Sequence, residues 1–406
     1  MVSASLQRGI EFIRRQHKSL KVNLAKNVVQ NFSLWLTKQY QSIYIIGLGA
    51  DPLQLGYVNS IGGAAVALIS FPLGWLADRH GIRKILIAAL PLMALGSAIF
   101  ALSWRWEVTA LALIVSTMAL RMAMTVCPMI CGSTLSSEER ATGMQLCDTL
   151  SAAPRLVAPI VAAYLITAFG GMNVEGIRVL YWIQLFGLIA AFLIIYALFT
   201  NPRERVEDAE LPRFLGGIDR VLKEGRMVKR WTAYLMLSSF PMYLAIYVPL
   251  FAAEFKGADQ YTLGWMETAA MVTVLVLALP SGRLADIFGR KKLVFAMTPL
   301  YCASLLLLVY APSAVYLLVV GLLRGFLHLA SVTGSAVTAD LVPQELLGSW
   351  YGMIGFFRGV VSMVSPLIGG LIWTVLGPHY VFYFLLATQV SKLLILASVP
   401  SSLTRG

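Results

Sequence analysis

The chain of 406 residues is 58% hydrophobic and only 13% charged, and it carries a formal net charge of +12. Soluble domains carry about 25% charged residues, so this composition indicates a protein of the lipid bilayer. Nucleic-acid binding needs one basic surface, but the lysines and arginines here lie in short groups between apolar segments. The composition therefore argues against a soluble enzyme and against a nucleic-acid-binding protein.

Apolar segments of about 20 residues, the length that a helix needs to cross a bilayer, recur along the chain. They are too long for strands of a membrane barrel, which need about 10 alternating residues. We predict twelve such helices, at residues 28–50, 54–77, 85–103, 107–131, 143–168, 177–199, 231–253, 260–281, 292–311, 314–338, 349–374 and 378–399. The predicted fold class is an all-α membrane protein with 12 transmembrane helices.

The segment 1–27 precedes the first predicted helix and alternates apolar with basic side chains. This pattern is typical of an amphipathic helix on an anionic membrane surface, and a disordered basic tail is the alternative. Of the 32 lysines and arginines, 23 fall in segments on the same side of the membrane as the N-terminus. Because cytoplasmic segments are enriched in these residues, we expect both termini to be cytoplasmic and the protein to lie in the cytoplasmic (inner) membrane.

A polar tract at 201–230 separates six predicted helices from the next six. It predicts an N-terminal six-helix bundle at 28–200, a cytoplasmic linker with a surface helix at 201–230, and a C-terminal bundle at 231–406. Internal repetition of six spans is typical of transporters whose halves move around a site at mid-membrane.

A charged hairpin, GWLADRHGIRK at 74–84, recurs as GRLADIFGRKK at 282–292. Glycine permits a tight reversal, and an aspartate can accept from helix N-terminal amides or a neighbouring arginine. Two copies at matching places favour a conformational latch over a simple positive-inside anchor. The predicted latch residues are Gly74, Asp78, Gly81, Arg83, Gly282, Asp286, Gly289 and Arg290.

The G-x-L-A-D-x-x-G-R-K pattern resembles the signature hairpin of the major facilitator superfamily. The resemblance covers nearly the whole chain, because it includes twelve spans, a central loop and a hairpin in each half. The second copy is complete, whereas Ile82 stands where the family usually has its first basic residue. The resemblance implies two pseudo-symmetric six-helix bundles in a secondary transporter, which is not an enzyme and needs no cofactor.

Charged residues inside predicted helices cost about 2.5–3.5 kcal/mol each on insertion scales, so they normally face protein or water. The helical spacing places several on polar faces that we expect to line a substrate cavity. The predicted cavity residues are Asn31, Lys38, Arg121, Arg155, Arg324, His328 and Arg358. Two acids in the helices, Asp148 and Glu267, cannot neutralise the five lysines and arginines of this set, even where internal ion pairs form.

The excess positive charge predicts a small organic anion, or an amphiphile with an acidic head, as the substrate. Coupling to protons requires a titratable group, so Asp148 or Glu267 is predicted to carry the proton, with His328 as a modulator. The alternatives are a proton-antiport multidrug efflux pump and, in another class, a receptor or channel. The chain is expected to act as a monomer in the lipid bilayer.

Methionines and cysteines gather at 118–131, where Cys127 and Cys131 lie one helical turn apart. Thiolate and thioether ligands suit Cu(I), but both residue types are also ordinary core residues. Since the spacing forms no recognisable set of ligands, no metal site is predicted. A phosphate-binding loop of the G-x-x-x-x-G-K-[ST] type is absent from the sequence, so ATP-driven transport is not indicated.

Overall fold

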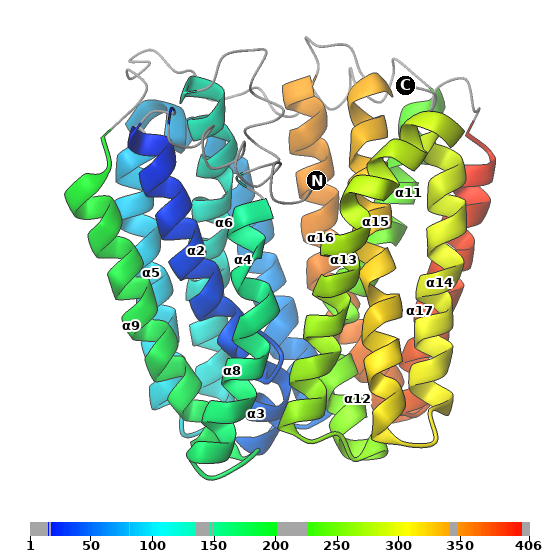
Figure 1. Cartoon of the computed structure of the whole chain (residues 1–406), viewed down its shortest axis with the longest axis horizontal. Helices are drawn as coiled ribbons and strands as arrows, with labels where there is room; N and C mark the ends of the chain where they lie inside the picture. Colours follow the sequence, from blue (N-terminus) through cyan, green and yellow to red (C-terminus); the bar gives the residue numbers. More distant parts are fainter. Residues whose placement is uncertain are drawn as a thin grey trace.

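The computed structural model describes residues 18–80, 82–134, 149–200, 226–341 and 347–399, together with Arg15 and Cys147. All regular elements of this part of the chain are helices, and they form two bundles that stand side by side (Figure 1). The first bundle holds α2 (Lys18–Lys38), α3 (Gln41–Gly47), α4 (Pro52–His80), α5 (Ile82–Leu102), α6 (Trp106–Thr134), α8 (Pro154–Ala168) and α9 (Val174–Leu198). The second holds α11 (Arg226–Leu244), α12 (Tyr247–Lys256), α13 (Gln260–Phe288), α14 (Arg290–Tyr310), a short 3-10 turn (Ala314–Tyr316), α15 (Leu317–Leu341), α16 (Leu347–Val375) and α17 (Pro378–Ala397).

Ten of the described helices are each long and apolar enough to cross a membrane. An eleventh span is the pair α11 and α12, which is bent by 46° at a short break. The remaining predicted span is also broken, into α2 and α3, and α2 carries four lysines. The helices agree with the twelve predicted spans, but the first span of each half is interrupted, which the apolar pattern did not indicate.

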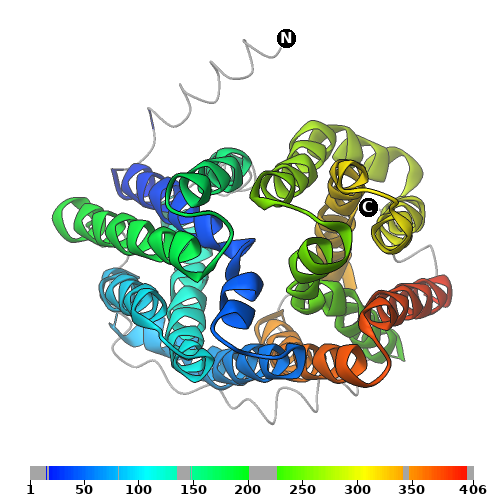
Figure 2. The same ribbon diagram turned by 90° about the horizontal axis from the view of Figure 1, so that it is seen from below.

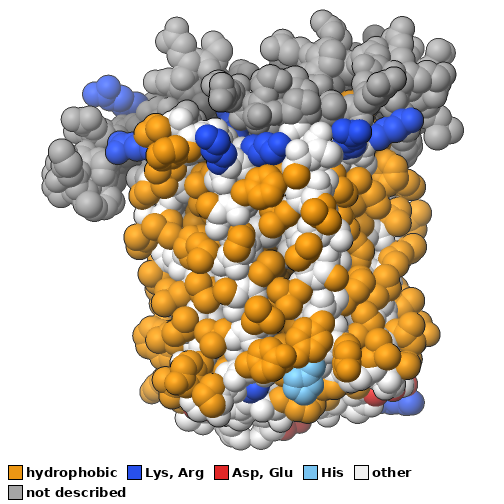
Figure 3. All heavy atoms as spheres, turned by 90° about the vertical axis from the view of Figure 1, so that its right-hand side faces the viewer, with side chains coloured by type: hydrophobic (Ala, Val, Ile, Leu, Met, Phe, Trp, Pro, Cys, Tyr) orange, Lys and Arg blue, Asp and Glu red, His pale blue; other side chains and the backbone are white. Residues whose placement is uncertain are grey.

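The two halves repeat one another in length and position. Helices α4 and α13 both have 29 residues, and α5 and α14 both have 21. In each of these two pairs, the helix of the second half begins 208 residues after its counterpart in the first. Hydrophobic side chains cover the face shown in Figure 3 in a broad band, and lysines and arginines form a row at one edge of it. The ten long apolar helices and this band indicate an integral membrane protein.

The edge with the basic row is where α4 gives way to α5 and α13 to α14, and we call it the hairpin end. The connection from α13 to α14 is made by Gly289, whose φ of +90° favours glycine because it lacks a Cβ. The other predicted latch residues lie toward the ends of these helices, but Gly81 and the side chains of Asp78 and Asp286 lie outside the described part of the chain. The latch therefore stays a prediction.

Arg83 in the first hairpin and Lys291 in the second stand at the same position of the G-x-L-A-D-x-x-G-R-K pattern, and they make the same kind of contact. The Arg83 guanidinium donates to the carbonyl of Tyr196 at 3.0 Å, near the end of α9. Its counterpart Lys291 donates to the carbonyl of Ala397 at 3.0 Å, at the end of α17. Cations at helix C-termini are favourable because the last carbonyls lack intrahelical partners. These residues therefore join the third helix of each half to the sixth.

The departure at Ile82 also has a structural reason. Its side chain is 2% exposed and packs with Ile85 and Leu86 in the core of the first half. A basic side chain at this position would lose its hydration without a partner in that core. At this position the first hairpin therefore carries a buried apolar side chain instead of a basic one.

The first helix begins at Lys18, within the segment predicted to lie on the membrane surface. Ser19, Asn23 and Lys26 are buried, at 0%, 1% and 1% exposure. Residues 18–27 therefore belong to the bundle. The rest of the predicted surface helix and the linker at 201–225 lie outside the described residues.

Candidate substrate cavity

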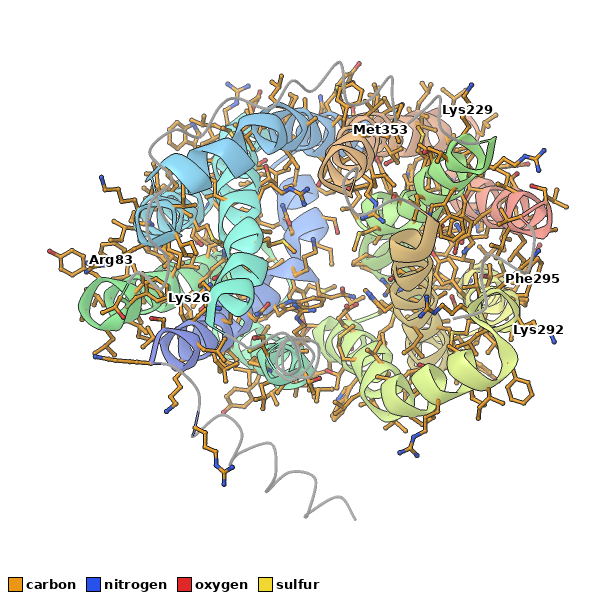
Figure 4. All side chains as sticks on the ribbon, turned by 90° about the horizontal axis from the view of Figure 1, so that it is seen from above. Lys26, Arg83, Lys229, Lys292, Phe295 and Met353 are labelled. Carbon is orange, nitrogen blue, oxygen red and sulfur yellow. The ribbon has the colours of Figure 1, made fainter. Side chains whose placement is uncertain are left out.

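The two halves meet along two pairs of helices, α4 with α16 and α8 with α13. These pairs lie on opposite sides of the centre of the molecule (Figures 2 and 4). Glycines allow a close approach at both: a Cβ added to Gly63 would lie 2.4 Å from the carbonyl oxygen of Ser362. One added to Gly264 would lie 2.8 Å from that of Pro159. Charged side chains from both halves gather beside each pair.

The first group lies beside α8 and α13, and we call it the Glu267 cluster. Its members are Lys38 and Arg155 from the first half and Glu267, Arg324 and His328 from the second. Arg324 Nη1 lies 3.5 Å from Glu267 Oε2. The Lys38 ammonium interacts electrostatically with the same carboxylate, and His328 lies in the fields of Glu267, Arg324 and Arg155. The cluster thus spans the boundary between the halves.

Arg155 is held by the first helix. Its Nη2 donates to Asn31 Oδ1 at 3.2 Å, and its guanidinium carbon lies 5.3 Å from the centre of the Trp35 ring. Asn31 and Trp35 are four residues apart, so they share one face of α2. An amide and an aromatic ring both orient the guanidinium, because one accepts its hydrogen bond and the other contacts its planar face.

The second group lies beside α4 and α16, and we call it the arginine pair. Arg121 of α6 and Arg358 of α16 come from opposite halves, lie near the middles of 29-residue helices, and interact electrostatically. The Tyr243 phenol lies in the fields of both. One turn beyond Arg358, Ser362 donates to the Gly63 carbonyl at 3.3 Å, which fixes this face of α16 against α4.

Several of these charges are open to solvent although they lie within spans. Lys38 and Arg358 are exposed, and Arg155 and Arg324 are partly exposed, while Glu267 is buried at 7% exposure. Since Lys38 and Arg358 each interact with the opposite half, their exposed surface faces the space between the halves. Charged, solvent-accessible side chains from both halves therefore gather between the two bundles, where the sequence predicts a substrate cavity.

The structure brings together all the predicted cavity residues, five in or against the Glu267 cluster and two in the arginine pair. Asp148 and the side chains of Cys127 and Cys131 lie outside the described part of the chain. Within the described part, no group of three or more His, Cys, Asp or Glu side chains could hold a metal ion.

Sequence reasoning did not assign Tyr40 or Tyr247 to a contact between the halves, where the structure places both hydroxyls. Their spacing of 207 residues, close to that of the hairpins, was the available signal.

Two helical bundles that repeat one another are the architecture of a known family of membrane proteins. The chain belongs to the Major Facilitator Superfamily, whose family model matches residues 28–263 and 231–391. A probable galactarate/D-glucarate transporter, GudP of Bacillus subtilis, is 20% identical over 80% of this chain and 78% of its own length. A crystal structure of a mutant of the nucleoside transporter NupG has a TM-score of 0.76 at 17% identity and covers 93% of this chain and 99% of its own.

Other relatives match a shorter segment. An uncharacterized MFS-type transporter of Mycobacterium tuberculosis (strain CDC 1551 / Oshkosh) is 24% identical over 39% of this chain, which corresponds to 23% of its own length. The match to the family model over both halves confirms the superfamily predicted from the hairpins.

Proposed function

We propose that this protein is a secondary active transporter that moves a small organic anion, or an amphiphile with an acidic head, by alternating access. The observation that carries the proposal is the charge between the two halves. Five basic side chains lie in the two groups, and Glu267 is their acidic member. Even with Asp148 included, three positive charges remain in excess. An anion that enters the cavity supplies the missing negative charge.

The similarity to GudP supports the same class of substrate, because galactarate and D-glucarate are anions at neutral pH. Both groups combine residues of the two halves, so a bound anion interacts with both halves at once. A ligand shifts a conformational equilibrium only by its difference in affinity between the states. An anion that contacts both halves binds more tightly when the halves are together, because separation of the halves removes part of its contacts.

We further propose that transport is coupled to protons through Glu267, with His328 beside it. Protonation of Glu267 would remove its interaction with Arg324 and Lys38 and leave these cations to the anionic substrate. Proton binding and anion binding then support one another. In this proposal the hairpin end is cytoplasmic, as the basic row at that end favours, and the protein works as a monomer in the inner membrane.

Arg155→Gln is expected to weaken anion binding by about tenfold or more, because charge-assisted hydrogen bonds contribute about 1.5–3 kcal/mol. The matched control is Arg178→Gln, since Arg178 pairs with Glu175 at 2.6 Å outside the cavity groups. The measurement is the thermal stabilisation of the purified protein by a panel of organic anions and of cationic dyes.

Stabilisation by the dyes alone would overturn the anion proposal in favour of a multidrug efflux pump. Flux across proteoliposomes separates a transporter from the other classes. Anion binding without flux would indicate a receptor, and conductance far above a transporter's turnover would indicate a channel.

A further inference from the structure

We infer that the arginine pair is a second anion subsite, so that the substrate carries two anionic groups. This inference rests on the proposed function and narrows it. The Glu267 cluster and the arginine pair are built from different helices. The first uses α2, α8, α13 and α15, and the second uses α6, α11 and α16.

Each group lies beside a different hydrogen bond between the two halves. Beside the Glu267 cluster, Thr268 donates to the Leu156 carbonyl at 3.0 Å. Beside the arginine pair, Ser362 contacts the Gly63 carbonyl. The two helix pairs lie on opposite sides of the centre of the molecule (Figure 4), so the two groups belong to different contacts between the halves.

The arginine pair also has its own electrostatic requirement. Two guanidinium groups from opposite halves repel one another, and this repulsion acts against closure of the cavity at their level. A carboxylate between them would replace the repulsion with two attractive, charge-assisted contacts. The Tyr243 hydroxyl, which lies in the field of both arginines, offers a further hydrogen bond to the same group. A substrate with one acidic group at each end would satisfy both subsites at once.

The test compares straight-chain monocarboxylates with dicarboxylates of the same length, from four to eight carbons, as ligands that stabilise the purified protein. We expect the best dicarboxylate to bind at least about tenfold tighter than its monocarboxylate. Arg358→Gln should remove this advantage, so that the dicarboxylate and the monocarboxylate of the same length bind with similar affinity. The control is Arg230→Gln, because Arg230 contacts the Ser398 carbonyl at the hairpin end.

Equal affinities of monocarboxylates and dicarboxylates, with no effect of Arg358→Gln, would overturn the second subsite and leave the proposed function intact. Failure of every carboxylate to bind the wild-type protein would overturn both.

A different observation carries a second inference. We propose that Tyr40 and Tyr247 form two further latches, separate from the predicted hairpin latch, which hold the two halves together at the end opposite the hairpins. Both side chains are buried at 0% exposure, and both residues stand at the break in the first span of their half, since Tyr40 precedes α3 and Tyr247 begins α12. Helices α3 and α12 lie at the end of the molecule opposite the hairpins (Figure 1).

The hydrogen bonds of the two tyrosines follow the internal repeat. The Tyr40 hydroxyl lies 3.3 Å from the Pro159 carbonyl of its own half and 2.9 Å from the Gln260 carbonyl of the other. The Tyr247 hydroxyl lies 2.8 Å from the Pro366 carbonyl of its own half and 3.2 Å from the Pro52 carbonyl of the other. Tyr40 and Tyr247 are 207 residues apart, as are Pro159 and Pro366. The two acceptors in the opposite half, Pro52 and Gln260, begin α4 and α13 and are 208 residues apart.

Each tyrosine hydroxyl has an acceptor both when the two halves are together and when they are apart. A phenol has one hydrogen, so it donates fully to one carbonyl at a time. When the halves separate, each hydroxyl loses the carbonyl of the other half but keeps the proline carbonyl of its own. Neither state leaves a buried donor without an acceptor, which lowers the cost of opening.

A matched pair of glycines completes each latch. A Cβ on Gly56 would lie 2.6 Å from the Pro366 oxygen and 2.9 Å from the Tyr247 hydroxyl. A Cβ on Gly264 would lie 2.8 Å from the Pro159 oxygen and 3.3 Å from the Tyr40 hydroxyl. A larger residue at either glycine would collide with the backbone of the other half, so closure at this end requires glycine at both.

The experiment measures the distance between spin labels at Phe169 and Val315, two exposed positions in opposite halves, in a cysteine-free background. Tyr40→Phe and Tyr247→Phe should each shift the ratio of closed to open protein by about threefold, and the double variant by about eightfold. The matched control is Tyr44→Phe, because the Tyr44 hydroxyl donates to the Phe100 carbonyl of its own half at 2.8 Å.

Gly56→Ala and Gly264→Ala test the same latches without touching the tyrosines, and each should favour the open form more strongly than the loss of one hydroxyl. If both tyrosine variants give the Tyr44→Phe distance distribution and both glycine variants give that of the wild type, the latches do not exist.

Discussion

Glu267→Gln is expected to abolish the dependence of transport on a pH gradient while leaving exchange of anions across the membrane intact. Glutamine keeps the shape and hydrogen-bonding capacity of a protonated glutamate, but it has neither the negative charge nor the transferable proton. Uptake in the presence of a pH gradient should fall to the level measured without one, because the variant carries no proton at this position. The variant should also bind anions at least as tightly, since Arg324 and Lys38 lose an internal competitor.

The measurement is uptake and exchange of hexanedioate in proteoliposomes, with and without an imposed pH gradient. Glu175→Gln serves as the control, because Glu175 is an exposed partner of Arg178. Unchanged pH-driven uptake in the Glu267 variant would assign coupling to another group, and Asp148→Asn is then the next variant to measure.

Gly321→Ala is expected to destabilise the second half. A Cβ at this position would lie 2.1 Å from the carbonyl oxygen of Met266, a backbone atom that cannot turn aside. Gly321, Arg324, Gly325 and His328 share one face of α15, so the close approach to α13 at the glycines brings Arg324 to Glu267. The substitution must push the two helices apart, at a cost of about 1–3 kcal/mol or more.

The thermal unfolding midpoint of the purified protein should fall by several degrees in this variant, and anion affinity should fall with it. Gly282→Ala in α13 is the control, because a Cβ there meets no atom within 4 Å. Alanine is favoured over glycine in a helix by about 1 kcal/mol, so this control should be slightly stabilised. Equal midpoints for the two variants would contradict the packing argument.

The apolar spans and their arrangement in two similar halves could be predicted because each leaves a local pattern. A span needs a continuous apolar length, and a repeated hairpin preserves its spacing. The charged residues between the halves could be predicted as a set, since a charge within a span is costly unless it faces water or protein. Lys38, Arg155 and Arg324 were selected on this ground alone, and their role in a cavity stays a prediction.

The sorting of these residues into two groups could not be predicted, because it depends on which helices of opposite halves meet. Arg121 belongs with Arg358 and not with Arg155, although helical spacing treats them alike. The latches were missed for a related reason. A buried tyrosine is ordinary in an apolar sequence, and only the pairing of Tyr40 with Gln260 across the molecule distinguishes it.

The composition of α2 has a consequence for how the protein is made. This helix does not reach the apolarity of the ten single-helix spans found in the described chain, and its buried residues include Lys26, Gln30 and Thr37. Thr37 donates to Gln184 of α9 at 2.6 Å, and Ser19 donates to the carbonyl of Thr200 at 2.8 Å. Other polar groups of α2 find partners earlier in the chain, since Gln30 donates to the sulfur of Met93 at 3.6 Å. The partners of Ser19 and Thr37, however, are synthesised about 150 residues or more after them. These two side chains of α2 therefore gain their partners only after the sixth span has been made.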